Sequence, residues 1–285
     1  MLAVLLEWII IASLFYVNAI YESIPLLVIS IIIIGSRLHA LGVFMHEATH
    51  YRLHPNRKVN DFMGNVFCAW PILTTLASYR KNHLAHHRHM NTSEDPDWFS
   101  KIDVQYFQFP MARKDIVIAY LKALTGVMFF TFYLKRTLDI SNNQKADTGK
   151  NSHKWIRFAC YILILAGSYF SGYFSLIILL WLIPIMTSLV FFAHIRSVAE
   201  HFALPLEHKL NSTRTVKASW WEKVFCAPYN VQYHLEHHLY PSIPWYNLAD
   251  CHQELCLNSD YLEHAHITDG YFSGLMAECQ QSNDG

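Results

Sequence analysis

Histidine spacing is the feature of this chain from which chemistry can be inferred. The run HEATH places His46 and His50 four residues apart, and two later runs, HLAHH at 83–87 and HLEHH at 234–238, share the form HxxHH. On a helix, positions i, i+3 and i+4 project from one face, so the imidazoles of each run can reach one metal ion. The pattern therefore predicts a metal centre assembled from three helical turns.

The number of histidines indicates more than one ion. With His201, which ends the last apolar segment in SVAEH, the runs supply nine imidazoles. Structural zinc takes four protein ligands and catalytic zinc three, so nine imidazoles fit two ions with four or five ligands each. Imidazole binds zinc, copper, iron and nickel, and residue type alone leaves the metal open.

Polar residues beside the runs are candidates for orienting the ligands. A ligating histidine usually donates its other N–H to a carboxylate or a carbonyl. The neighbouring carboxylates are Glu47, Asp95, Asp97, Glu200 and Glu236, each of which is alternatively a solvated surface charge. Asn230 is expected either to bond a ligand or a water, or to cap the helix of the third run.

The remaining histidines divide into two groups. His39 and His194 lie seven residues before His46 and His201, so each faces the same way as its partner and either lines a substrate path or packs at a helix end. Surface positions are expected for His153, His208, His252, His264 and His266.

The elements that must position these residues are membrane helices. Four apolar segments approach the roughly 20 residues that cross a hydrocarbon core, at 2–20, 24–44, 155–171 and 173–195. Short polar or glycine-containing turns join them in two hairpins, and Pro184 predicts a kink in the last helix. Segments 66–79 and 117–134 contain Pro71 and Lys122 and are predicted to be interfacial, because one extra crossing would separate the histidine runs.

The charge distribution predicts which side carries the site. Basic residues such as Arg52, Lys81 and Lys154 fall outside the hairpins, whereas the hairpin tips have none. By the positive-inside rule, residues 46–154 and 196–285 form a cytoplasmic cap. The predicted fold class is an all-α membrane protein, a single domain over residues 1–285 with four transmembrane helices in two hairpins.

The composition excludes several classes of protein. The chain is 53% hydrophobic, 15% charged and formally neutral, which gives no electrostatic case for nucleic acid. Its six cysteines contain no CxxC pair, which argues against a disulfide framework, a zinc ribbon and an iron–sulfur cluster.

These motifs resemble the membrane fatty acid desaturase and hydroxylase superfamily. The similarity rests on HEATH at 46–50, RKNHLAHHRHMNTSEDPDW at 80–98, RSVAEHF at 196–202 and NVQYHLEHHLYPSIPW at 230–245, in this order and after membrane hairpins. It extends from roughly the second apolar segment to residue 250.

The resemblance implies an iron enzyme. It implies two iron ions (Fe2+/Fe3+) held by His46, His50, His83, His86, His87, His201, His234, His237 and His238, and oxidation of an unactivated C–H bond with dioxygen. Heme, flavin and ferredoxin motifs are missing from the sequence, so a separate electron donor of ferredoxin or cytochrome type is expected on the cap. A fatty acyl or related lipid is the expected substrate; a carotenoid or a small metabolite is the alternative.

The reaction type remains open at this stage, as do two less favoured functions, a zinc protease and a metal transporter. EDPDW and YHLEHH resemble desaturases more than alkane hydroxylases, which favours desaturation over hydroxylation or ketone formation. HEATH also fits HExxH, in which two histidines bind zinc and Glu47 is the base of a membrane protease, but this leaves both HxxHH runs unused. A metal transporter would carry its ligands near the membrane midplane rather than at helix ends.

Overall fold

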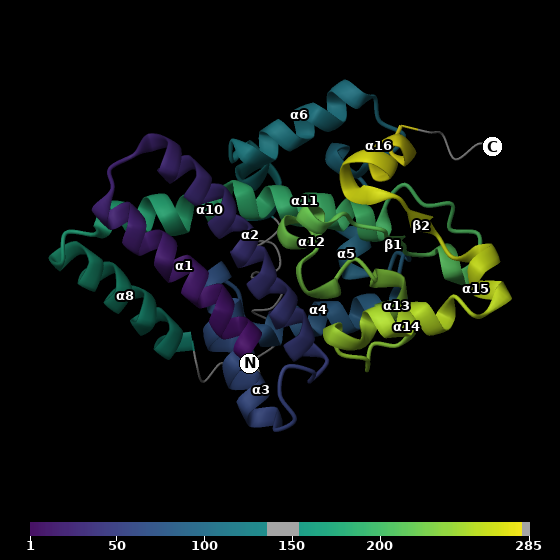
Figure 1. Ribbon diagram of the computed structural model, residues 1–285, viewed down its shortest axis with the longest axis horizontal. Coiled ribbons are helices and arrows are strands. Elements are labelled where there is room, and N and C mark those ends of the chain that lie inside the picture. The colour runs from purple at the N-terminus through teal and green to yellow at the C-terminus, as the bar shows by residue number, and fades with distance from the viewer. Residues whose placement is uncertain (136–153, 281–285) are drawn as a thin grey trace.

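The computed structural model describes residues 1–135 and 154–280, and this part of the chain is mainly helical, as predicted (Figure 1). Its first half contains α1 (Leu2–Ile20), α2 (Ile24–Thr49), α3 (Arg57–Met63), η1 (Gly64–Ala69), η2 (Trp70–Ile72), α4 (Leu76–His89), α5 (Pro96–Phe99), η3 (Gln105–Phe107), α6 (Arg113–Leu124) and η4 (Phe129–Tyr133). Residues 136–153 of the predicted cap, including His153, lie outside the described residues.

The second half is helical apart from one short strand pair. It contains α8 (Lys154–Phe170), α9 (Phe174–Ile177), η5 (Ile178–Leu182), α10 (Ile183–Met186), α11 (Ser188–His201), η6 (Lys209–Asn211), α12 (Trp220–Phe225), η7 (Pro228–Asn230), α13 (His234–Leu239), η8 (Trp245–Asn247), α14 (Leu248–Leu255), α15 (Ser259–His264), η9 (Gly270–Gly274) and α16 (Leu275–Glu278). Strands β1 (Thr215–Val216) and β2 (Ile267–Thr268) pair in parallel.

Three helical segments are long and apolar enough to cross a membrane. They are Leu2–Ile20, Ile24–Thr49 and Phe174–His201. The predicted segment 155–171 forms α8, whose 17 residues fall short of the roughly 20 that span a hydrocarbon core. The second and last predicted segments continue as helix beyond residues 44 and 195, so the first histidine run and His201 lie at the ends of helices that are long and apolar enough to cross a membrane.

The last long segment is broken near its proline. A π-helical turn, Ile178–Leu182, precedes Pro184, and Thr187 has non-helical angles of φ −123° and ψ −90°. A proline ring clashes with the carbonyl four residues earlier and removes one backbone donor, which accounts for the irregular turn. The break leaves α11 a separate straight segment that carries His201.

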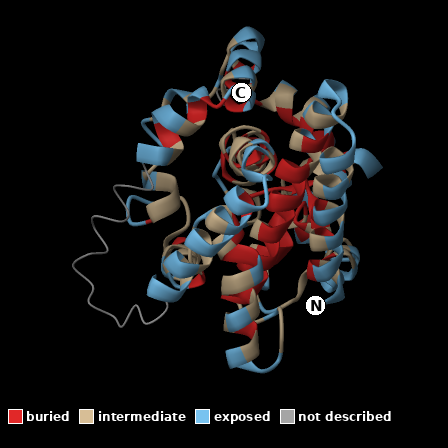
Figure 2. Ribbon diagram, turned by 90° about the vertical axis from the view of Figure 1, so that its left-hand side faces the viewer, coloured by how far each residue is buried: buried red, intermediate tan, exposed pale blue. Residues whose placement is uncertain are grey.

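Close packing of α2 and α11 sets the frame of the site. A Cβ added to Gly35 would lie 2.0 Å from Ser188 Oγ, and the Ser188 hydroxyl donates to the Ile31 carbonyl over 2.7 Å. Small residues allow such an approach between apolar helices. In Figure 2 the buried residues gather in the interior of the molecule, while exposed residues cover the outer helices.

The two intermediate apolar segments do not form long helices. Residues 64–72 are short π and 3-10 turns, and the segment after α6 is interrupted at Gly126, whose φ is +80°. All six cysteines are free thiols, as their spacing predicts. The described cap residues C-terminal to α11 surround α13 with short helices, seen at the right of Figure 1.

Candidate metal centre

The three histidine runs lie on helices that converge at one place. Run one ends α2, run two lies on α4, whose N-terminus is capped by the Thr75 hydroxyl, and run three begins α13. His201 is the last residue of α11. The structure brings all nine histidines together in two groups, which we call the first and second histidine clusters.

The first histidine cluster consists of five imidazoles. Its members are His46, His50, His83, His87 and His237, each with one ring nitrogen within 4.8 Å of the others. The Nε2 atom of His83 lies 2.9 Å from Nε2 of both His50 and His87, and His87 Nε2 lies 3.0 Å from His237 Nε2. All three runs thus contribute to one group.

The second histidine cluster consists of four imidazoles. Its members are His86, His201, His234 and His238. Nε2 of His234 lies 3.0 Å from Nε2 of His201 and 3.1 Å from Nε2 of His238, and the rings of His86 and His201 have centroids 4.5 Å apart. Adjacent histidines of each HxxHH run therefore point into different clusters.

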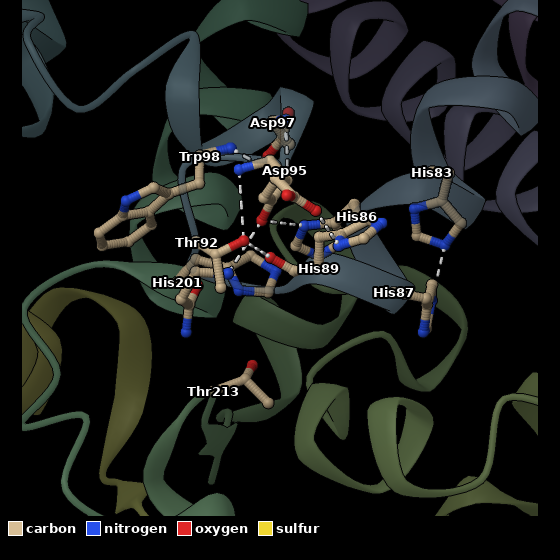
Figure 3. A network of polar contacts seen from close by, with 12 residues as sticks. His83, His86, His87, His89, Thr92, Asp95, Asp97, Trp98, His201 and Thr213 are labelled. Carbon is tan, nitrogen blue, oxygen red and sulfur yellow. Dashed lines mark hydrogen bonds and ion pairs between the residues drawn. The ribbon is translucent and has the colours of Figure 1, made fainter.

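Carboxylates contact the outer nitrogens of the second cluster. Asp95 Oδ2 lies 2.7 Å from Nδ1 of His86, seen in Figure 3, and Glu200 Oε1 lies 3.2 Å from Nδ1 of His234. Asp95 also accepts backbone N–H groups from Asn91, Asp97 and Trp98, which holds it in place. These contacts leave Nε2 of each ring for the cluster centre.

Glu47 lies near the first cluster but makes no hydrogen bond to His46. Its Oε1 lies 3.7 Å from Nδ1 of His46, beyond hydrogen-bond range, and its Oε2 accepts the Trp245 backbone N–H over 3.1 Å. Among the described residues, Nδ1 of His237 has no hydrogen-bond partner, and the same holds for Nδ1 of His201 and His234 in the second cluster. The clusters differ in that Asp95 is hydrogen-bonded to His86 of the second, whereas Glu47 beside the first bonds to Trp245.

Asn230 and Glu236 form hydrogen bonds with residues other than the clustered histidines, whereas the charge of Asp97 acts on His201 of the second cluster. Asp97 pairs with Lys101 over 2.5 Å. Asn230 donates to the Trp245 carbonyl, and α13 has no side-chain cap, so neither predicted role of Asn230 is observed. Glu236 is fully buried and its hydrogen-bond partners lie in the cap.

The Glu236 network includes residues that the spacing analysis missed. The Thr215 hydroxyl, Nδ1 of His252 and the Tyr261 hydroxyl lie 2.5, 2.5 and 2.6 Å from its carboxylate. The predicted surface position of His252 is wrong, since its side chain is only 16% exposed. Arg196, 2.5 Å from Glu200, was also missed, although its i,i+4 spacing on α11 is a signal for this pair.

The other histidines of the described residues belong to neither cluster. His39 and His194 are buried; His39 stacks near Phe192 and His194 contacts the Phe107 ring, with centroids 5.0 Å apart. His266 is half-buried against Glu278.

Burial lowers the pKa of several clustered imidazoles. Burial, helped by the charges of Arg52 and Arg80, lowers the pKa of His50 to about 4. Burial is also the main cause that lowers the pKa of His87 to about 3. The same cause sets the pKa well below the usual range for His83, His234, His237 and His238. Neutral rings present the lone pairs that metal binding requires.

The donor set fits a pair of metal ions. Nε2 atoms point toward common centres, and the hydrogen bond of Asp95 to Nδ1 of His86 is the arrangement that fixes a ligating tautomer. Glu200 lies 3.2 Å from Nδ1 of His234. An HExxH zinc site would use only two of these nine histidines, and the clusters lie at helix ends rather than midway along the apolar helices, unlike a transport site.

Comparison with known proteins identifies the family. The sequence model of the family described as "Fatty acid desaturase" matches residues 22–269. The chain is 28% identical to dihydrorhizobitoxine desaturase of Bradyrhizobium elkanii, over 77% of this chain and 65% of that protein. It is 24% identical to the chloroplastic omega-6 fatty acid desaturase of Glycine max, over 86% of this chain and 60% of the relative.

A hydroxylase is also among the similar proteins. The ceramide hydroxylase of Caulobacter vibrioides is 25% identical over 81% of this chain and 74% of its own length. The chain spans less than two thirds of the length of the two desaturases above.

Proposed function

The chain belongs to the fatty acid desaturase family, and from this premise we propose that it is a dioxygen-dependent di-iron desaturase of a fatty acyl or related lipid substrate. The observation that carries the proposal is the gathering of nine histidines into two adjacent clusters. One iron ion in each cluster accounts for every histidine of the three runs and for His201. The family resemblance, rather than the imidazole donors, selects iron.

The iron pair would supply the oxidising power for C–H cleavage, and the chain's own residues prepare the site. Asp95 accepts the Nδ1 proton of His86 and keeps Nε2 free for a metal. Glu200, paired with Arg196, places a carboxylate oxygen 3.2 Å from Nδ1 of His234. Burial of His46, His201, His234 and His237 limits access of water. A turnover converts CH2–CH2 and dioxygen, with two electrons and two protons, to CH=CH and two waters.

The proposed topology is four transmembrane helices in two hairpins with the clusters on the cytoplasmic side. Three apolar helices of sufficient length support it, as does the contact of α1 with α2 and of α8 with α9. Both clusters lie at the ends of α2 and α11, so the two hairpins would deliver them to one face. We propose α8 as the remaining span, completed by flanking residues.

Electrons would come from a separate donor of ferredoxin or cytochrome type that docks on the cap. Arg88 is an exposed basic residue on the same helix as the second histidine run. Positive charge near the centre suits an acidic redox partner, whose encounter it would accelerate. Salt should then slow electron delivery without changing the iron content.

Hydroxylation is the second candidate, favoured by the similarity to a ceramide hydroxylase. The two reactions are separated by supplying iron-reconstituted protein with a reductant, a total lipid extract and 18O2, followed by mass spectrometry. Desaturation predicts a product lighter by two hydrogens without the label. A product that gains one labelled oxygen would replace desaturation with hydroxylation, and no product with an intact iron pair would refute the lipid substrate.

A further inference from the structure

A chain of three polar side chains runs through the cap behind the third histidine run. It joins the carboxylate of Glu236 on α13 to the imidazole of His252 on α14, and this imidazole to the thiol of Cys256. Helix α14 packs on α13 at the right of Figure 1. None of the three residues belongs to a histidine cluster, and the proposed oxidation at the metals uses none of them.

The distances assign a role to each member of this chain. Nδ1 of His252 lies 2.5 Å from Glu236 Oε1, so Nδ1 carries the ring proton and donates it to the carboxylate. Nε2 then has the free lone pair, and Cys256 Sγ lies 3.6 Å from it, within hydrogen-bond distance for sulfur. The thiol therefore faces an imidazole whose other nitrogen is held by a carboxylate, which is the order of groups in a nucleophilic triad.

Glu236 is fixed as the acceptor at the buried end of the chain. Its carboxylate is fully buried and accepts the Thr215 hydroxyl over 2.5 Å and the Tyr261 hydroxyl over 2.6 Å. Burial and the charge of Glu236 raise the pKa of the Tyr261 hydroxyl, so this group remains a donor. A carboxylate held in this way keeps the imidazole in one tautomer and stabilises the imidazolium that forms when the ring takes a proton.

The end of α14 brings the imidazole and the thiol together. His252 and Cys256 are four residues apart and share one face, and the Cys256 N–H donates to the His252 carbonyl over 3.0 Å. The Tyr233 ring packs on the imidazole, with centroids 5.1 Å apart. Because the C-terminal end of a helix disfavours a thiolate, the reactivity of this thiol depends on His252 as the base.

Cys256 differs from the cysteines around it. Burial raises the pKa of the Cys226 and Cys279 thiols to about 12, and both are enclosed in the core. Cys251, on the same helix, is half-buried like Cys256, but burial and the charge of Glu236 raise the pKa of its thiol. Among the cysteines of the described residues, Cys256 alone combines partial exposure with a hydrogen bond to an imidazole.

We propose that Cys256 is a nucleophilic thiol, activated by His252 in the orientation that Glu236 imposes, and that small uncharged electrophiles such as hydrogen peroxide modify it. Sγ attacks one peroxide oxygen while the thiol proton passes to Nε2 of His252. The O–O bond breaks, and the leaving hydroxide takes this proton and departs as water. The thiol is oxidised by two electrons to a sulfenic acid and the peroxide is reduced to water, so the reaction needs no other reagent.

The test compares two thiols on one helix of the full-length protein in nanodiscs. Alkylation by iodoacetamide at neutral pH is followed by mass spectrometry after cleavage at Glu254, which places Cys251 and Cys256 in separate peptides. We expect Cys256 to react about tenfold faster than Cys251. Hydrogen peroxide, with dimedone to trap the sulfenic acid, should label Cys256 preferentially. The ratio between the two thiols cancels any peroxide that bound metals consume.

His252→Asn separates the base from its surroundings. The asparagine amide can still donate to Glu236 but cannot accept the thiol proton, so alkylation of Cys256 should slow about 100-fold at unchanged thermal stability. The matched control is His264→Asn, which changes a 38%-exposed histidine on α15 and should leave the rate at Cys256 unchanged. Glu236→Gln should slow alkylation of Cys256 about tenfold, because the ring loses its orienting carboxylate.

Three results would overturn the proposal. Equal rates at Cys251 and Cys256 in the wild type would refute the activated thiol, even if a variant failed to fold. An unchanged rate at Cys256 in folded His252→Asn protein would refute the role of the base. Faster alkylation of Cys256 in Glu236→Gln would indicate a loosened cap and refute the orienting role of Glu236.

Discussion

The two histidine clusters share the second and third runs, whereas the first run contributes only to the first cluster, and their surroundings differ. In the second cluster, Asp95 is hydrogen-bonded to Nδ1 of His86, Glu200 lies 3.2 Å from Nδ1 of His234, and a cavity opens at His201. In the first cluster, Glu47 lies 3.7 Å from Nδ1 of His46, which is too far for a hydrogen bond. The comparison shows that two sets of histidine ligands can differ in basicity and orientation because different residues contact their outer ring nitrogens.

This difference assigns distinct properties to the two metals. Negative carboxylates behind the second cluster increase the basicity of its ligands and stabilise a bound cation. The first cluster includes the half-buried His50 and His87, and it lacks such close carboxylates at the described residues. The second cluster is the one that adjoins the cavity, because His201 lines it.

The largest effect is expected when the second cluster loses its carboxylate. Asp95→Asn removes the negative partner of His86 and should lower the iron affinity of the second cluster about 10–100-fold, with the first cluster unchanged. Iron titration with Mössbauer detection measures both sites. Glu94→Gln is the matched control from the same loop, since the Glu94 side chain is 72% exposed and contacts His89, which belongs to neither cluster. Equal losses in both variants would show that the comparison between clusters is wrong.

A second prediction concerns the helices that set the two clusters apart. Gly35→Ala places a Cβ 2.7 Å from the Leu189 backbone nitrogen, and this should lower the free energy of unfolding by about 1–3 kcal/mol. Because α2 carries His46 and α11 carries His201, iron binding at both clusters should weaken together. Gly167→Ala meets no atom within 4 Å and should be neutral in thermal unfolding. A neutral Gly35→Ala would contradict the close packing.

Acid should loosen the region beside the second cluster. Burial alone would raise the pKa of Glu278, but hydrogen bonding from His266 and the charge of Arg214 hold it below its usual value. A carboxyl with a lower pKa when folded contributes stability above the unfolded value of about 4.3, and this is lost as pH falls through the folded value. Arg214 donates to the carbonyls of Phe202 and Ala203, so the protection of residues 202–206 against hydrogen exchange should fall below about pH 4.3. The same protection should stay constant between pH 8 and 6.

The smallest effect is expected at Glu47. The amide oxygen of Glu47→Gln can still accept the Trp245 N–H, so iron content and oxidation should stay within about twofold of the wild type. Complete loss of activity with zinc bound at His46 and His50 would revive the protease interpretation, in which Glu47 is the base. Metal analysis and turnover of the same preparation distinguish these outcomes.

Much of the fold and of the site was predictable from local patterns. Helical periodicity joins the members of each run, and apolar segments predict the long helices. The same periodicity could have excluded Glu236: two residues after His234, it projects about 200° around the helix, toward Thr215 and Tyr261. Its sequence proximity to the ligands was misleading.

The partition of the histidines and the contact between Arg214 and Glu278 could not be predicted. His86 and His87 are adjacent and project about 100° apart on α4, and which cluster each one enters depends on where the other helices lie, which is a tertiary property. Likewise, Arg214 and Glu278 are 64 residues apart and meet only through the pairing of β1 and β2. Single-sequence periodicity carries no information on such contacts.

The most direct test of the di-iron account is 57Fe Mössbauer spectroscopy of reconstituted wild type, His86→Ala and His237→Ala. The account predicts two coupled irons per chain in the wild type. Each variant should lose the iron of one cluster, the second for His86→Ala and the first for His237→Ala, and with it the coupling. One metal per chain that survives both substitutions would contradict the account.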